Sequence, residues 1–235
     1  MIKKKILCII PARGGSKSIR HKNLLKLGKF TLLEHTIKFA KLFKKIDEIV
    51  LSSDSQKILK KGKKYKIKCI KRSKKNSLDF SLVADTIHEV LRHYNKRDIY
   101  FENIILLEPT FPFRKKYHLN KCLNAVVNNG YDSSATFSKS SVHPWKLWNI
   151  KKKKTLPFNK NNSPWKPKQF LSQVYKLTGS VYVISTKKFK SNLKKLLFGK
   201  IKPIICNEEE HFIDIDQLKD YRIAKLLFKN ENKRY

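Results

Sequence analysis

The sequence predicts an α/β fold, with a mostly parallel central sheet and helices on both of its faces. Short apolar runs typical of buried strands alternate, through the first half of the chain, with segments whose apolar residues recur at helical spacing. Polar clusters follow three of these runs, at residues 13–22, 52–55 and 108–114. Ligands bind at the carboxyl ends of the strands in such sheets, so the same observations predict a binding site.

The chain is long enough for one sizeable hydrophobic core. It has 235 residues, of which 40% are hydrophobic, so we expect a single domain over residues 1–235. No apolar run approaches the roughly 20 residues that span a bilayer, and the run after the N-terminal lysines is too short for a signal peptide. We therefore expect a cytoplasmic protein without membrane insertion. Its four cysteines lie far apart, which favours free thiols.

The expected elements of the first half follow from local pattern. The uninterrupted apolar run at residues 6–10 predicts the first strand. Thr31 and Glu34 have the spacing of a capping box and an apolar stripe follows them, so a helix is expected to begin near Thr31. Apolar runs and helical apolar spacing then predict strands at 49–51, 67–70, 104–107 and 133–138, and helices at 56–61, 83–94 and 119–127.

Residues 140–172 break this alternation and are expected to leave the sheet. Trp145 and Trp148 are followed by four lysines and a stretch rich in Asn and Pro. Either this excursion is a dimerisation arm whose aromatic side chains a partner covers, or it is a surface hairpin with its own small apolar cluster. The sheet is expected to resume at 180–184 and 201–206, followed by a strand end at 212–216 and a helix at 217–228.

The formal net charge of +36 suggests nucleic-acid binding as one function class. Only eight of the 54 basic residues are Arg, however, and the lysines are spread along the whole chain. Specific recognition of bases and phosphates generally uses more Arg. The charge pattern therefore indicates attraction of anionic ligands and argues against specific nucleic-acid binding as the main function.

The segment after the first strand is typical of a phosphate-binding loop. It places Gly14 and Gly15 among the cations Arg13, Lys17 and Lys22, between a strand and a helix. Glycines let backbone N–H groups approach phosphate oxygens, and Arg or Lys supplies the opposing charge. The spacing is not that of a Walker motif, and the alternative is an ordinary strand-to-helix turn with solvated cations.

Asp214 and Asp216 are the second chemical signal. Residues at i and i+2 of a strand share a face, so both carboxylates can converge on Mg²⁺ together with substrate phosphates. The alternative is that Asp216 only caps the following helix while Asp214 is solvated. A basic loop and paired carboxylates in one α/β domain together indicate metal-assisted nucleotidyl transfer.

Six segments carry a resemblance to a known family. They are residues 10–24, 52–55, 72–79, 106–114, 178–183 and 213–216. In them the chain resembles the acylneuraminate (CMP-sialic acid, or nonulosonic acid) cytidylyltransferases over nearly its whole length. The resemblance implies a three-layer Rossmann-like nucleotidyltransferase fold and a homodimer in which residues 140–172 form a β-rich dimerisation arm. It also implies the use of Mg²⁺ or another divalent cation.

The reaction that the resemblance implies joins CTP to an acidic nine-carbon sugar and releases pyrophosphate. The sugar's anomeric hydroxyl attacks the α-phosphate. By matching position, the catalytic residues are Arg13, Lys22, Asp214 and Asp216, the last two as metal ligands. The implied nucleotide site comprises Ala12, Arg13, Gly14, Gly15, Ser16, Lys17, Lys22, Asn23, Arg72 and Asp79. The implied sugar site includes Glu108, Gln169 and Tyr182.

The chain departs from the family pattern near the expected sugar site. Glu108 stands where the family has glutamine, which places an anion before a substrate that is itself an acid. Lys168 stands where the family has arginine, which loses bidentate carboxylate recognition. Phe111 and Phe113 replace smaller residues. These differences favour a variant acid of the legionaminic or pseudaminic type.

Two other functions stay open from the sequence. One is activation of the eight-carbon acid of lipopolysaccharide, KDO, although the Gln-Gly-Asp-Glu-Pro segment usual in that family is absent from this chain. The other is a basic nucleic-acid-associated protein.

Overall fold

The computed structural model describes residues 2–16, 18–151, 154–159, 163–190, 193–207 and 213–231. Its strands are β1 (Ile2–Pro11), β2 (Lys26–Leu27), β3 (Phe30–Thr31), β4 (Glu48–Ser53), β5 (Lys68–Lys71), β6 (Ile99–Leu106), β7 (Ser133–Lys139), β8 (Trp148–Lys151), β9 (Lys154–Pro157), β10 (Tyr175–Ser185) and β11 (Ile201–Cys206). Its α-helices are α1 (Leu32–Lys41), α2 (Gln56–Lys64), α3 (Val83–Asn95), α4 (Lys116–Val127) and α5 (Leu218–Glu231).

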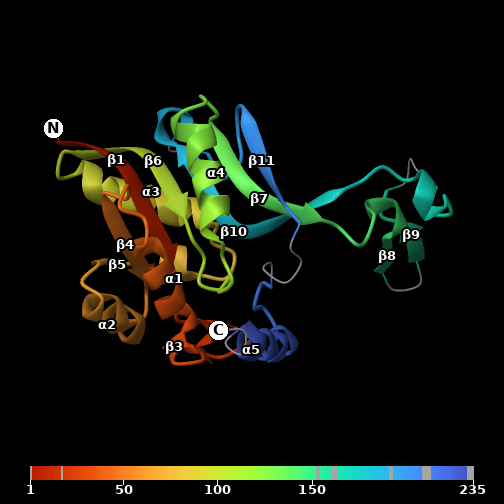
Figure 1. Cartoon of the computed structure of the whole chain (residues 1–235), viewed down its shortest axis with the longest axis horizontal. Coiled ribbons are helices and arrows are strands. Elements are labelled where there is room, and N and C mark those ends of the chain that lie inside the picture. Colours follow the sequence, from red (N-terminus) through yellow and green to blue (C-terminus); the bar gives the residue numbers. More distant parts are fainter. Residues whose placement is uncertain are drawn as a thin grey trace.

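A seven-stranded sheet in the order β11-β7-β10-β6-β1-β4-β5 forms the centre of the molecule (Figure 1). The neighbouring strands are parallel, except that β10 runs antiparallel to both β6 and β7. The prediction of a mostly parallel sheet is therefore confirmed.

Helices cover both faces of this sheet because the central strands are apolar on both sides. Ile6, Cys8 and Ile10 of β1 pack on one face with residues of α1, α2 and α4. Leu7 and Ile9 point to the opposite face, where residues of α3 cover them. Successive side chains of a strand alternate between faces, so a strand buried on both sides has a continuous apolar run such as residues 6–10.

The start of α1 confirms the predicted capping box. The Thr31 hydroxyl accepts a hydrogen bond from the Glu34 N–H, and the Thr31 N–H donates to Glu34 Oε2 at 2.8 Å. The strand end predicted at 212–216 is wrong: residues 213–216 have no regular secondary structure, and Phe212 lies outside the described residues. No α-helix in the described ranges is long and apolar enough to cross a membrane.

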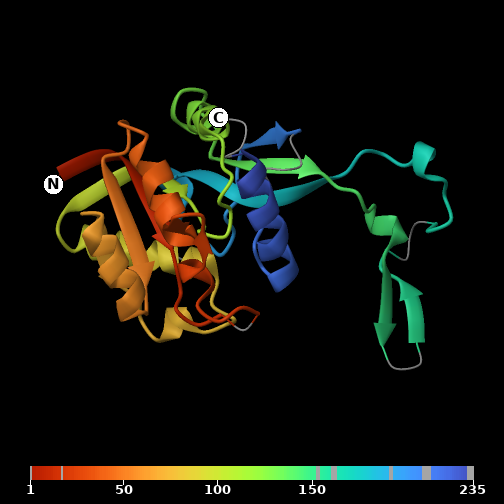
Figure 2. The ribbon, with the colours of Figure 1, turned by 60° about the horizontal axis from the view of Figure 1, so that its bottom comes forward.

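Residues 140–172 leave the body of the molecule as predicted. They form an arm that carries the β8–β9 hairpin and projects from the ends of β7 and β10 (Figures 1 and 2). The rings of Trp148 and Trp165 lie 6.0 Å apart, yet Trp165 is 79% exposed and Ile150 73%. Much of the arm's apolar surface is therefore uncovered in the single chain, and its coverage by a partner stays a prediction.

A bulge in β10 places a glycine against a large aromatic ring. The register between β7 and β10 shifts between Leu177 and Tyr182, and Gly179 in this stretch has φ +78°. A Cβ on Gly179 would lie 2.9 Å from Cζ of Phe111, which is 2% exposed. Both the backbone conformation and the ring therefore require glycine here.

Gly179→Ala is expected to lower the free energy of unfolding by about 2–4 kcal/mol, from αL strain plus overpacking. Gly130→Ala is the matched control, because Gly130 has φ +67° but a Cβ added there would meet no atom within 4 Å. Gly130→Ala should lower the free energy of unfolding by the backbone strain alone, about 1–2 kcal/mol. Urea denaturation measures both, and equal losses would show that the Phe111 ring moves aside at little cost.

Candidate active site

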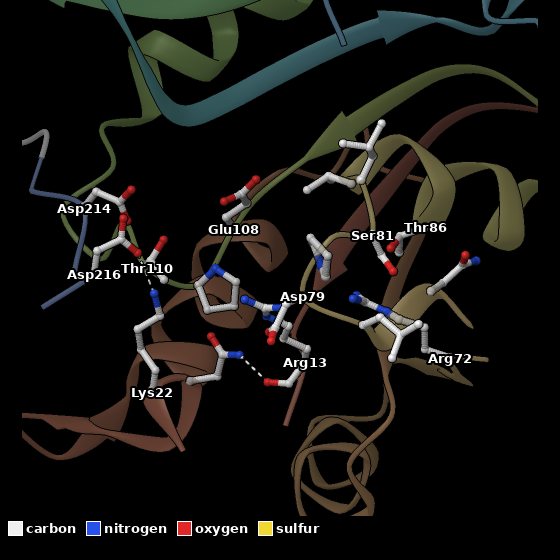
Figure 3. Close-up of a pocket in the computed structure, with 17 residues that line it drawn as sticks. Arg13, Lys22, Arg72, Asp79, Ser81, Thr86, Glu108, Thr110, Asp214 and Asp216 are labelled. Atoms are coloured by element: carbon white, nitrogen blue, oxygen red, sulfur yellow. Dashed lines mark hydrogen bonds and ion pairs between the residues drawn. The ribbon is translucent and has the colours of Figure 1, made fainter. Parts of the chain in front are cut away.

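A cavity of about 310 Å³ opens at the carboxyl ends of β1, β5 and β6 (Figure 3). Figure 3 shows Lys22, Asp214 and Asp216 at one end of this cavity and Arg72 at the other. It is the edge of the sheet at which the sequence predicts binding. The predicted site residues that line it are Arg13, Lys22, Asn23, Arg72, Asp79, Glu108, Asp214 and Asp216.

The loop after β1 supplies cations to the cavity, while its glycines do not line it. Arg13, Lys22 and Asn23 line the cavity, and Asn23 Nδ2 donates to the backbone oxygen of Arg13 at 2.9 Å. The other described residues that we expected at the nucleotide, namely Ala12, Gly14, Gly15 and Ser16, are not part of its lining. Lys17 lies outside the described residues.

The N–H of Gly14 is already bonded within the protein. It donates to Asp54 Oδ1 at 2.7 Å, whereas the sequence suggested that it approaches a phosphate. A Cβ on Gly14 would lie 2.6 Å from Cβ of Ser55. Glycine is therefore required at this position for close contact with the segment after β4.

The two loop cations that line the cavity are paired with carboxylates across it. Arg13 Nη1 lies 2.9 Å from Asp79 Oδ1, and Lys22 Nζ lies 2.6 Å from Asp216 Oδ1. These contacts join loop residues to carboxylates 66 and 194 positions away in the chain. The cavity is thus partly neutralised by its own side chains.

The two aspartates lie in an irregular segment that a small core holds in place. Ile215 between them is fully buried with Leu27 and Leu32, and its N–H donates to the backbone oxygen of Thr110 at 3.0 Å. The same cluster includes residues of the loop and of α5, so it fixes the carboxylates relative to Lys22.

The alternative role of Asp216 as a helix cap is not what the structure shows. Asp220 Oδ2 accepts the backbone N–H groups of Asp216 and Gln217 at 3.1 and 2.7 Å. The Asp216 carboxylate is directed to Lys22 instead. Because 213–216 is not a strand, the two carboxylates meet through the fold of this segment and not by strand alternation.

Asp214 and Asp216 fit a divalent cation. Asp214 Oδ1 is buried and has no hydrogen-bond partner among the described residues. Burial, with the adjacent Asp216 charge, raises the pKa of Asp214 to about 6, against the opposing effects of Thr110 and Lys22. The described residues contain no group of three or more His, Cys, Asp or Glu placed to hold a metal. Two carboxylates would therefore supply part of the coordination sphere, and substrate oxygens and water the rest.

The opposite end of the cavity is built around a buried arginine. Arg72 is 7% exposed, and its Nε and Nη2 donate to Ser52 Oγ at 3.3 Å and Ser52 O at 3.0 Å. Burial lowers its pKa, while Asp54 and Glu89 oppose that shift. The site residues predicted from the sequence do not include four polar residues that also line the cavity, Asn76, Ser81, Thr86 and Thr110. Three of them lie inside or next to the segments that carry the family resemblance, whereas Thr86 lies within the helical stretch at 83–94.

Glu108 is not the simple anion that the sequence suggested. It is partly buried at the end of β6 and lines the cavity. Burial and the neighbouring Asp214 charge raise its pKa to about 7, although Arg114 lowers it. The protonated form, which can donate a hydrogen bond, is therefore favoured more than in an ordinary glutamate.

Arg114 fixes the loop that carries Glu108. It is buried, and it donates to Ser180 O at 2.7 Å, to Phe111 O at 2.6 Å and to Thr36 Oγ1 at 3.1 Å. It also donates to the backbone oxygen of Glu108. Burial lowers the pKa of Arg114 to about 9, so it remains a cation at neutral pH.

Tyr182 and Gln169 are not part of the cavity lining. Tyr182 lies in β10 between Leu106 and Ala135. Burial raises its pKa, and the charges of Glu108 and Asp214 add to this shift. Gln169 is exposed in the short 3-10 helix Lys168–Phe170 of the arm.

Comparison with known proteins shows the family of the chain. Residues 7–225 match the family model described as cytidylyltransferase. The chain is 30% identical to CMP-N,N'-diacetyllegionaminic acid synthase of Legionella pneumophila, over 95% of this chain and 96% of that protein. It is 27% identical to a pseudaminic acid cytidylyltransferase of Campylobacter jejuni, over 96% and 97% of the two chains.

Solved structures share the fold. A CMP:2-keto-3-deoxy-manno-octonic acid synthetase complexed with CTP superposes with a TM-score of 0.69 at 15% identity, over 97% of this chain and all of that one. A 4-diphosphocytidyl-2C-methyl-D-erythritol synthase from Anaerococcus prevotii gives 0.65 at 19% identity, over 96% of each chain. The nucleotidyltransferase fold implied by the sequence is thus confirmed. Because a single family model covers most of the chain, this protein belongs to the cytidylyltransferase family and is a cytidylyltransferase enzyme.

Proposed function

We propose that the protein activates a nonulosonic acid by the reaction CTP + sugar acid → CMP-sugar + pyrophosphate. One observation carries the proposal: a single cavity brings Arg13 and Lys22 from the first loop together with Asp214 and Asp216 from the end of the chain. The relatives named above are synthases of CMP-linked nonulosonic acids, which supports this class of acceptor.

The cations and carboxylates of the cavity have separate roles in this reaction. Arg13 and Lys22 bind and neutralise the triphosphate, and Arg72 lies toward the cytidine. Asp214 and Asp216 hold Mg²⁺, which offsets charge on the phosphate oxygens when bound. The anomeric oxygen forms a bond to the α-phosphorus, the bond from that phosphorus to the β-phosphate breaks, and pyrophosphate leaves. One of the two carboxylates also takes the proton of the attacking hydroxyl.

The sugar acid binds beside Glu108. Glu108 and Thr110 belong to the loop that Arg114 fixes, and Figure 3 shows Thr110 beside Asp214 and Asp216, with Glu108 farther along the cavity. A protonated Glu108 donates to the acceptor as the family's glutamine amide would. This supports an acceptor with the acidic character of the family's substrates.

The arm supports a homodimer. Its apolar side chains are largely exposed in the single chain, as Trp165 and Ile150 show. Gln169, the arm residue implied in sugar binding, does not line its own chain's cavity. In the proposed dimer the partner covers the arm.

The test is pyrophosphate release from CTP with a panel of acids: N,N'-diacetyllegionaminic, pseudaminic, N-acetylneuraminic and the eight-carbon acid. We expect release with at least one nine-carbon acid, and its loss when EDTA removes divalent cations. Arg13→Ala should lower the rate by about 10²-fold or more. Release only with the eight-carbon acid would contradict the proposed acceptor, and a rate for Arg13→Ala within a few-fold of wild type would contradict the role of the loop.

A further inference from the structure

The segment Ser52-Ser53-Asp54-Ser55 joins the loop after β1 to the Arg72 end of the cavity. It leaves the carboxyl end of β4, which lies between β1 and β5 in the sheet. Toward β1, Ser52 O accepts the N–H of Ala12 at 2.9 Å. Toward β5, the Arg72 N–H donates to Ser53 O at 2.9 Å, and its guanidinium donates to Ser52. The segment is therefore in contact with both the phosphate loop and the nucleoside end.

Asp54 contacts the residue that follows Arg13 in the chain. Its Oδ1 accepts the Gly14 N–H at 2.7 Å, and a hydrogen bond to a carboxylate is stronger than one between neutral groups. Gly14 is packed against Ser55, whereas a Cβ on Gly15 would meet no atom within 4 Å. The loop is thus held at Gly14 and open at Gly15. Asp54 itself does not line the cavity.

We propose that Asp54 is a positioning residue for nucleotide binding, which fixes the Gly14 N–H so that Arg13 projects into the cavity toward the triphosphate. The inference rests on the proposed function in that the loop's ligand is the triphosphate of CTP. Asp54 also attracts Arg72 electrostatically. Without Asp54, the residue after Arg13 loses its anchor, and the backbone around Arg13 is held only by the Ala12–Ser52 and Asn23–Arg13 hydrogen bonds.

Asp47 provides a matched control next to the same strand. Its Oδ2 accepts the backbone N–H groups of Lys5 and Ile6 at 2.9 and 2.8 Å. Both aspartates accept backbone N–H groups of this part of the chain. Asp47 binds within β1, whereas Asp54 binds the loop that follows it. Asp47→Ala removes hydrogen bonds of the same kind without touching the cavity lining.

The experiment compares the CTP affinity of Asp54→Ala, Asp54→Asn and Asp47→Ala by isothermal titration calorimetry, with the melting temperature of each full-length variant. Asp54→Ala should weaken CTP binding by roughly tenfold or more. Asp54→Asn keeps an oxygen acceptor and should stay within about threefold of wild type. Asp47→Ala should lower the melting temperature and leave the CTP affinity unchanged. An unchanged affinity in Asp54→Ala, or an equal loss in Asp47→Ala, would overturn the proposal.

Hydrogen exchange separates this inference from the proposed function. In the nucleotide-free protein, the peptide that contains Gly14 should exchange faster in Asp54→Ala than in wild type or Asp47→Ala. If wild type binds no CTP, the proposed function fails while the exchange result still reports on the loop. If the Gly14 peptide exchanges equally in all variants, Asp54 does not hold the loop and the inference fails.

Discussion

Lys22→Met is expected to lower kcat/KM for CTP by about 10²-fold, the usual effect of removing one charged donor from a developing anion. The same substitution should strengthen the binding of Mn²⁺ to the nucleotide-free protein by roughly three- to fivefold. The reason is the 2.6 Å ion pair between Lys22 and Asp216. A cation at Asp216 has to displace the ammonium group, and a triphosphate offers that ammonium group a new partner. Pyrophosphate release and Mn²⁺ titration followed by electron paramagnetic resonance measure the two effects.

Arg13→Met is the charge-matched control for metal binding. It also removes one positive charge from the cavity, but Arg13 is paired with Asp79 instead of Asp216. Its effect on Mn²⁺ affinity should be clearly smaller than that of Lys22→Met. Equal gains would mean that only the long-range field of the cavity changed, and that the Lys22–Asp216 contact does not compete with the metal.

Glu108→Gln is expected to remove a pH dependence from the stability of the metal-free protein. The folded state holds the Glu108 proton with a pKa of about 7, whereas an ordinary glutamate titrates near 4.3. The folded state therefore binds this proton more tightly than the unfolded state does. The contribution of the proton to the free energy of unfolding is fully present below the pKa of the unfolded state, and it is lost as the pH rises through 7. Between pH 4.5 and 8, the free energy of unfolding of wild type should fall by about 3 kcal/mol relative to that of Glu108→Gln.

Urea denaturation in EDTA at several pH values measures this difference, and EDTA keeps metal from the nearby aspartates. Glu102→Gln, on an exposed residue of the same strand, controls for the loss of one carboxylate and should follow wild type. Parallel pH profiles for wild type and Glu108→Gln would show that Glu108 titrates as an ordinary carboxylate. In that case Glu108 would face the sugar acid as an ionised carboxylate, as the sequence suggests.

Much of the fold was predictable because it depends on local pattern. The capping box of Thr31 and Glu34 is a contact between residues three apart, so the start of α1 followed from two letters of sequence. Residues 6–10 formed a buried strand because only burial on both faces favours such a run. The segment 213–216 resembled a strand because isoleucine and aspartate alternate in it, but Ile215 is buried in the small cluster with Leu27, Leu32 and residues of α5, and not in the sheet.

Residue types set the chemistry of the site, and long-range contacts set its geometry. Arg13, Lys22, Asp214 and Asp216 were recognisable from charge and spacing, and the cavity unites them. Gln169 was assigned to the sugar site from a motif, yet it lies in the arm and does not line its own chain's cavity. A sequence motif gives the residue types, but it does not give the position in space of an arm that leaves the sheet.

The sequence by itself determined the α/β sheet, the basic loop after its first strand and the acidic pair near the chain's end. It did so because periodicity, glycine and charge act within a few residues. Only the tertiary structure decided that Lys22 pairs with Asp216, that Asp54 holds Gly14 and that Glu108 has a pKa of about 7. Each of these depends on groups brought together from distant parts of the chain, and on the burial that results.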